Sequence, residues 1–181
     1  MADALGNEAR AAAMQWERFG GRSAFHGPVA TVRCREAAGL IRQCIDEPGN
    51  GRVLVVDAGG SLAAAVVGDR MAAIALRNGW SGIVVHGAVR DTDALGRMDI
   101  GLFALGAVPR RGTFDTSGER DIPVTLGELL VRPGDCIFCD GDGVVACSEE
   151  AARRLRLPFP LLAAESPAWP SSIRPSTLPP P

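Results

Sequence analysis

The fold follows from residues 53–91, VLVVDAGGSLAAAVVGDRMAAIALRNGWSGIVVHGAVRD, in which two continuous apolar runs flank a helical pattern. Residues 53–56 and 82–86 are β-branched runs, typical of strands buried on both faces of a sheet. Between them, apolar residues recur at helical spacing over residues 71–76, and Gly79 supplies a left-handed stop. A strand–helix–strand unit of this kind predicts parallel strands joined by a crossover, and therefore an α/β fold.

Shorter elements are expected on either side of this unit. We expect one domain over residues 16–157, because the chain is too short for two comfortable ones. A lead-in over residues 1–15 is expected to be frayed or helical, and prolines in residues 158–181 predict an extended tail. Residues 110–121 are polar and contain glycine, which predicts a long loop. Strands are expected at 27–32, 101–105, 123–125, 136–139 and 143–146, and helices at 37–45 and 148–157.

Composition excludes several classes of function. The 181-residue chain is 46% hydrophobic and 22% charged with a formal net charge of −2, so we expect no general attraction to nucleic acid or to a membrane surface. Tyrosine is absent and aromatic residues make up 5%, which disfavours a base-stacking surface. No segment reaches the roughly 18 continuous apolar residues of a membrane span, and no export signal is recognisable. We therefore expect a cytoplasmic protein.

The five cysteines include a CxxC pair, Cys136 and Cys139. A structural zinc site needs four ligands, and the only histidines are His26 and His86. A redox CxxC normally opens a helix, whereas this pair lies in an apolar run between turns, as in a short strand. We predict that the cysteines are structural and not part of a disulfide framework.

Candidate chemistry lies beyond the carboxyl ends of the two buried strands, where ligands of parallel sheets bind. Arg90 can clamp a carboxylate, and Asp91 suits an oxygen-ligated divalent cation. Alternatively, the two form a surface ion pair that caps the next helix. Gly68 precedes a helix whose first N–H groups attract an anion, although it could simply start the helix. The candidate site residues are Gly68, Asp69, Arg70, Met71, Arg90 and Asp91.

The chain resembles the family of ribonuclease activity regulator A (RraA) and 4-hydroxy-4-methyl-2-oxoglutarate (HMG/CHA) aldolase over some two-thirds of its length. The resemblance implies a swivelling β/β/α domain, with a central mixed or parallel sheet flanked by helices. It also implies a homotrimer with sites between neighbouring subunits. The segments that carry it are residues 19–22, 27–32, 53–57, 87–91, 99–101, 118–121 and 134–135.

The resemblance further implies a divalent-metal-dependent class II aldolase, which splits 4-hydroxy-4-methyl-2-oxoglutarate into two pyruvates and also decarboxylates oxaloacetate. The N–H groups of residues 68–71 then hold the carboxylate of a small 2-oxo acid. Arg90 contacts the pyruvyl oxygens, Asp91 holds Mg²⁺ or Mn²⁺, and Asp69 orders the metal's waters. A water of this kind is our candidate base for the C4 hydroxyl. His86 is either a proton carrier or, as we favour, a packed residue at a strand end.

One position departs from the family pattern. The pattern often continues Arg-Asp, two residues, then Asp or Glu, but here that position is Ala94. Asp93 comes one residue earlier, and on a helix beginning at Thr92 it would point in another direction. The side chains that would contact the waters of the metal therefore differ from the family pattern, whereas the direct ligand, Asp91, does not.

Two other functions remain open. Some relatives inhibit an endoribonuclease, RNase E, by protein–protein contact, which requires no metal; the intact Arg90-Asp91 pair favours the enzyme. A methyltransferase of menaquinone synthesis is an older description of the family. The chain lacks a strand followed by GxGxG for a methyl-donor nucleotide, which counts against that activity.

Overall fold

The structure, a computed structural model, describes residues 6–154. Four α-helices and twelve strands are found in this part of the chain. The elements are the 3₁₀ helix η1 (Gly6–Glu8), β1 (Arg10–Ala11), β2 (Glu17–Arg18), β3 (Phe25–Arg33), α2 (Gly39–Asp46), β4 (Val53–Asp57), β5 (Ala65–Val67), α3 (Asp69–Arg77), β6 (Gly82–Val89), α4 (Thr92–Leu95), β7 (Gly101–Ala107), β8 (Glu119–Arg120), β9 (Val124–Leu126), β10 (Leu129–Val131), β11 (Cys136–Asp140), β12 (Gly143–Cys147) and α5 (Glu149–Arg154).

The central sheet is mixed, as predicted. Its strands follow the order β1-β12-β11-β3-β4-β6-β7-β2, with β5 attached to β6 and β8 attached to β3. The middle strands β3, β4, β6 and β7 run parallel, whereas β11, β12, β1 and β2 add antiparallel pairs at the two sides. The α/β class is therefore confirmed, and the parallel strands end together at one edge of the sheet.

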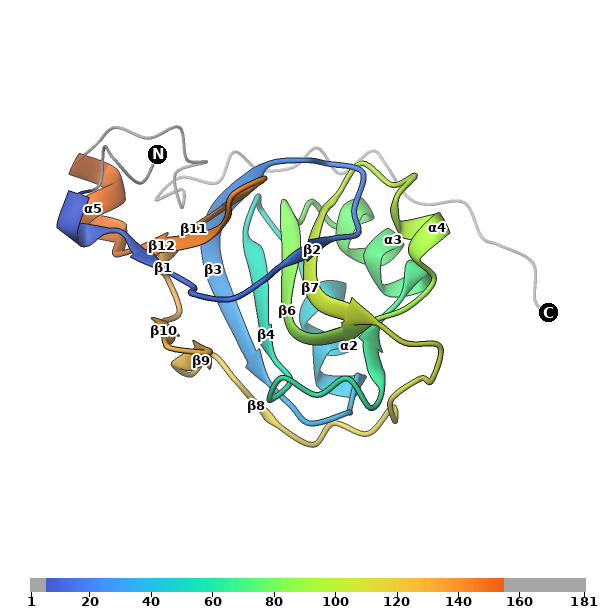
Figure 1. Ribbon diagram of the computed structural model, residues 1–181. Helices are drawn as coiled ribbons and strands as arrows, with labels where there is room; N and C mark the ends of the chain where they lie inside the picture. The colour runs from blue at the N-terminus through green and yellow to red at the C-terminus, as the bar shows by residue number, and fades with distance from the viewer. Residues whose placement is uncertain (1–5, 155–181) are drawn as a thin grey trace, which may run out of the picture.

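The sheet is covered on both faces, which gives β/β/α layers. Helices α2, α3 and α4 lie against one face (Figure 1), and the larger hydrophobic core fills the space between them and the sheet. A second core lies on the other face, where the β9–β10 hairpin packs against β3, β4 and β11. All five residues of β4 are buried, because this central strand contacts both cores.

The strand β6 is longer than the sequence pattern indicated. It continues through Gly87, Ala88 and Val89, three residues beyond the predicted end at residue 86. Residues Ala88 and Val89 pair with β5, a short strand that was not predicted, and with β7 after a register shift that follows Val85. Hydrogen bonding to these distant segments extends the strand, so Arg90 and Asp91 follow directly at its end.

The N-terminal segment also differs from its expected frayed or helical form. After the single turn of η1, β1 pairs with β12, and the Arg10 guanidinium lies 2.7 Å from the Asp135 carboxylate. The predicted C-terminal helix begins next to Ser148, as expected, because the Ser148 hydroxyl accepts a hydrogen bond from the Ala151 N–H. The Pro-rich tail over residues 158–181 lies outside the described residues.

All five cysteines are free and buried. Burial raises the pKa of Cys34 and Cys44 to about 11 and that of Cys136 to about 12, so these thiols stay protonated at neutral pH. Cys136 and Cys139 lie in β11 and not at a helix start. The prediction that the CxxC pair lies in a short strand is confirmed, and the burial of all five thiols supports a structural role. Within residues 6–154, no helix combines the length and apolar character needed to cross a membrane.

Candidate active site

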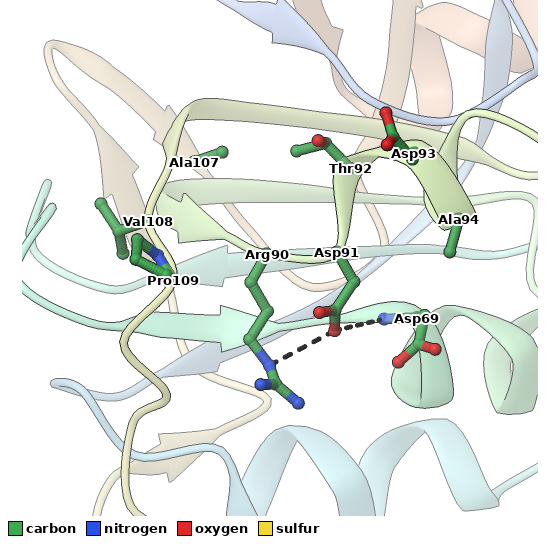
Figure 2. A pocket seen from close by; sticks show the side chains of 9 residues that line it. All are labelled: Asp69, Arg90, Asp91, Thr92, Asp93, Ala94, Ala107, Val108 and Pro109. Carbon is green, nitrogen blue, oxygen red and sulfur yellow. Dashed lines mark hydrogen bonds and ion pairs between the residues drawn. The ribbon is translucent and has the colours of Figure 1, made fainter.

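Asp91 turns its carboxylate away from the helix that follows it. It occupies the N-cap position of α4, yet its side chain makes no capping hydrogen bond there. Instead, Oδ2 accepts from the Asp69 N–H at 3.4 Å and lies 3.4 Å from Arg90 Nε. The ion pair with Arg90 is present, but the alternative in which it caps α4 is wrong. The carboxylate faces the N-terminus of α3 (Figure 2).

The backbone of Asp91 has an unusual conformation that aims this side chain. Its φ of 62° and ψ of 41° place it in the left-handed region, which aspartate tolerates better than most residues. Such a conformation costs on the order of 1 kcal/mol and is concentrated at functional sites. Here it reverses the chain between β6 and α4 and directs the carboxylate back toward α3.

Gly68 is needed because two side chains come close to its backbone. A Cβ at this position would lie 2.6 Å from Asp91 Oδ2 and 3.1 Å from Arg90 Cγ and Nε. The φ of Gly68 is −138°, so the requirement is space and not a left-handed turn. The glycine thus lets Arg90 and Asp91 lie over the first turn of α3, where N–H groups without backbone partners and the helix dipole favour an anion.

Arg90 and Asp91 border an open pocket of about 590 Å³. Asp69 contributes to its wall, with Oδ1 accepting from the Arg70 N–H at 2.7 Å. Figure 2 shows Asp93 pointing away from Asp91 and Asp69, as the helical geometry of α4 predicted, while Ala94 offers no ligand atom. The lining residues are Asp69, Arg90, Asp91, Thr92, Asp93, Ala94, Ala107, Val108 and Pro109.

A smaller recess of about 70 Å³ adjoins the pocket, and Asp69 and Arg90 line both. Together the two cavities bring together all six residues predicted from the sequence. Four further parts of the site were not predicted from the sequence, namely β5, the segment after β7, Arg111 and Phe114. They join the site through pairing between distant segments. The recess is lined by Ala38, Ala65, Val66, Val67, Gly68, Asp69, Arg70, Met71, Arg90, Arg111 and Phe114.

The carboxylates present fit a hydrated hard cation. Among the described residues, no group of three or more His, Cys, Asp or Glu side chains is placed to hold a metal ion. A fully protein-ligated zinc or calcium site is therefore not built here. Mg²⁺ and Mn²⁺ prefer oxygen donors, and Mg²⁺ commonly keeps several waters while bound through one or two carboxylates and the substrate. Asp91 would be the direct ligand, and Asp69 would contact the waters.

A model of the RraA-like family, described as Aldolase/RraA, matches residues 1–146. The chain belongs to the RraA-like family. The RNA-processing inhibitor RraA from Thermus thermophilis is 42% identical, with a TM-score of 0.79 over 82% of this chain and 90% of that one. A protein described as S-adenosylmethionine:2-dimethylmenaquinone methyltransferase from Geobacillus kaustophilus HTA426 is 35% identical, with a TM-score of 0.80 over 82% and 92%.

A third RraA-like structure shows the breadth of the family. RraAS2 from Streptomyces coelicolor, described as an unusual member of the RNase ES inhibitor RraA family, is 26% identical with a TM-score of 0.71. The match covers 85% of this chain and 80% of that one. The family thus includes both inhibitors of RNA processing and aldolases, and membership by itself does not choose between them.

In this RraA-like chain, His86 belongs to a row of ionisable side chains outside both cavities. Glu119, Arg33, Asp57 and His86 occupy paired positions on four neighbouring strands. Arg33 Nε lies 3.5 Å from Asp57 Oδ2, and His86 Nδ1 lies 3.2 Å from Asp57 Oδ1. Burial opposes ionisation of Asp57, but hydrogen bonds from His86 and the Gly59 N–H, together with Arg33, hold the pKa of this carboxyl below its usual value. These contacts support the interpretation of His86 as a packed residue.

Asp57→Asn is expected to lower the free energy of unfolding by about 1–2 kcal/mol at pH 7, since the charged hydrogen bonds are lost. The folded-state pKa of Asp57 lies below the unfolded value, so this stabilisation exists above pH of about 4 and disappears as the pH falls through the folded-state pKa. Urea denaturation at pH 7 and at successively lower pH measures the difference. The exposed Asp46→Asn is the control, and an equal deficit at every pH would contradict the assignment.

Proposed function

We propose that this RraA-like chain is a cytoplasmic, divalent-metal-dependent lyase. It cleaves 4-hydroxy-4-methyl-2-oxoglutarate to pyruvate and decarboxylates oxaloacetate, with one catalytic domain over residues 16–157. The observation that carries the proposal is the placement of Arg90 and Asp91 over the N-terminus of α3 at the mouth of an open pocket. This arrangement offers an anion contact and a cation ligand side by side, as a 2-oxo acid and its metal require.

The residues that bind the substrate carboxylate are those of the first turn of α3. The N–H groups of Asp69, Arg70 and Met71 have no backbone partners within the helix, and the helix dipole adds partial positive charge. The Asp69 N–H faces the Asp91 carboxylate and the Arg70 N–H faces the Asp69 carboxylate, so this turn already attracts carboxylate oxygens. Gly68 allows an anion to approach them closely. Arg90 presents a planar guanidinium beside this turn and contacts the pyruvyl oxygens.

Both reactions break a C–C bond, release CO2 or a second pyruvate, and leave the electron pair as a pyruvate enolate, whose carbon then takes up a proton to give pyruvate. Bound Mg²⁺ or Mn²⁺, held by Asp91, would supply Lewis-acid stabilisation of the 2-oxo oxygen. Arg90 donates to the same oxygen as charge develops on it, which stabilises the transition state more than the ground state. In aldol cleavage the C4 hydroxyl loses a proton, and a water ordered by Asp69 accepts it.

Pyruvate release from oxaloacetate is the direct test. We expect turnover with Mg²⁺ or Mn²⁺ and a loss to near the uncatalysed rate after dialysis against EDTA, because a single guanidinium cannot replace the cation at the enolate oxygen. Coupled reduction of pyruvate measures the rate, and added Mg²⁺ should restore it. Full activity in excess EDTA after dialysis would remove the metal from the proposal.

The assembly is proposed to be a homotrimer. Two of the large exposed apolar side chains are Phe114 at the recess and Leu62 beside Gly106, and a neighbouring subunit would cover them. Light scattering at micromolar concentration should give about three times the chain mass of 18.9 kDa. A fully active monomer would contradict the trimer.

A second candidate function is inhibition of an endoribonuclease by protein–protein contact. It is favoured by the 42% identity to the RNA-processing inhibitor RraA, higher than that to the other two structures. Such contact needs neither the metal nor the charge of Asp91. An RNase E-type cleavage assay with added protein and EDTA distinguishes the two functions. Inhibition of RNA cleavage would support the regulator, and uninhibited cleavage would support the enzyme alone.

A further inference from the structure

Charge divides the two adjoining cavities. Three arginines and one aspartate line the recess, namely Arg70, Arg90, Arg111 and Asp69. The larger pocket has the opposite balance, with Asp69, Asp91 and Asp93 against Arg90 alone. An anionic group is therefore favoured in the recess and a cation in the pocket.

The recess suits one end of a 2-oxo acid. Its volume of about 70 Å³ is much smaller than the roughly 590 Å³ of the adjoining pocket, so the recess suits a carboxylate-sized group and the pocket the rest of the substrate. The first turn of α3 and Arg90 line the recess as well. The carboxylate that is bonded to the oxo carbon must lie in the recess if the oxo oxygen is to reach the boundary at Arg90 and Asp91.

Arg111 is held at the recess by its backbone. It forms a parallel bridge with Ala65, the first residue of β5, which leads directly into Gly68. The Ala65 N–H donates to the Arg110 carbonyl at 2.8 Å, and the Gly112 N–H donates to the Ala65 carbonyl at 2.9 Å. These bonds fix the position of Arg111 relative to the start of α3, although the two are far apart in sequence.

The charge of Arg111 is not used elsewhere in the described part of the chain. Its guanidinium carbon lies 5.3 Å from the centre of the Phe114 ring, and no ion pair among residues 6–154 includes it. Arg90, in contrast, shares its guanidinium with Asp91. Stacking on an aromatic face orients a guanidinium and leaves its N–H donors available to an oxyanion.

We infer that Arg111 is a second guanidinium contact for the C1 carboxylate of the 2-oxo acid, opposite the first turn of α3. This inference rests on the proposed function and adds to it a residue that binds substrate. Pyruvate and oxaloacetate share the C1 carboxylate, so both should depend on Arg111. The charge of that carboxylate does not change during the reaction, so Arg111 should act on binding more than on turnover.

The test combines pyruvate binding with oxaloacetate kinetics in the intact protein with Mg²⁺. Arg111→Ala is expected to raise the Kd for pyruvate and the KM for oxaloacetate by the same factor, roughly tenfold for one lost charge-assisted contact. The kcat should change much less. Arg111→Lys should recover part of the binding, and the neighbouring exposed Arg110→Ala is the matched control, expected to bind as the parent does.

Each other outcome has a definite meaning, given a circular dichroism spectrum that shows the variants folded. A raised KM for oxaloacetate with unchanged pyruvate binding would place Arg111 at the distal carboxylate and overturn the inference. If Arg111→Ala has the parental Kd for pyruvate and the parental KM for oxaloacetate, the inference is also overturned. The proposed function would still hold in that case, provided that the parent protein is active. If the parent protein binds pyruvate but does not decarboxylate oxaloacetate, and Arg111→Ala weakens that binding, the inference is supported and the lyase function is removed. A parent that neither binds pyruvate nor turns over would overturn both.

Discussion

Asp91→Asn should reduce oxaloacetate decarboxylation by about 10²–10³-fold in kcat at low millimolar Mg²⁺, because the substitution removes the one carboxylate among residues 6–154 that the proposed function assigns as a direct metal ligand. Asparagine is nearly the same size and is one of the few residues that readily adopts a φ near 62°, so the turn between β6 and α4 should persist. The loss of activity therefore reports on the charge and not on the backbone.

The dependence on metal concentration distinguishes this explanation from general damage. A weakened ligand should shift the Mg²⁺ titration to higher concentration, and excess Mg²⁺ should recover part of the activity. Asp93→Asn is the control from the same pocket, since Asp93 points away from Asp91 and Asp69 (Figure 2) and should retain most of the parent activity. A folded Asp91→Asn variant with parental kcat and an unshifted titration would place the metal elsewhere.

Arg90→Lys should lower kcat/KM. The expected loss of transition-state stabilisation, calculated from the ratio of the kcat/KM values, is roughly 2–4 kcal/mol. Lysine keeps the charge but loses the planar pair of donors that can contact the carboxylate and the developing enolate oxygen together. Because the proposed role of Arg90 includes contact with the oxygen on which charge develops, kcat should fall and KM should rise. This differs from the effect on binding alone that is expected at Arg111.

Steady-state kinetics with oxaloacetate measures the change, and thermal unfolding should show little loss of stability, since Arg90 is partly exposed and lies beyond the end of β6. Arg97→Lys is the control, because Arg97 is exposed and lies outside both cavities. It measures the effect of replacing an arginine by lysine away from the site. If Arg90→Lys and Asp91→Asn both decarboxylate oxaloacetate as the parent does while folded, the site lies elsewhere. Inhibition of an endoribonuclease then becomes the better function.

Local sequence determined the elements that carry the site. The apolar runs at residues 53–56 and 82–86 become β4 and β6, because a strand covered on both faces needs no polar alternation. The helix between them begins beside Gly68 and ends before Gly79, whose φ of 77° requires the conformational freedom of glycine. The parallel direction of these two strands and the carboxyl-edge location of the candidate residues follow from this pattern.

Tertiary structure alone decided how the site is completed. The two- and three-residue strands β1 and β5 have too little pattern to be recognised, and each exists because a distant strand supplies its hydrogen-bond partners. The same is true of Arg111, whose position depends on a bridge to Ala65. The direction of the Asp91 carboxylate depends on a left-handed backbone and on the space above Gly68. Pairing between distant segments and close backbone approach involve residues far apart in the chain, so no local pattern encodes them.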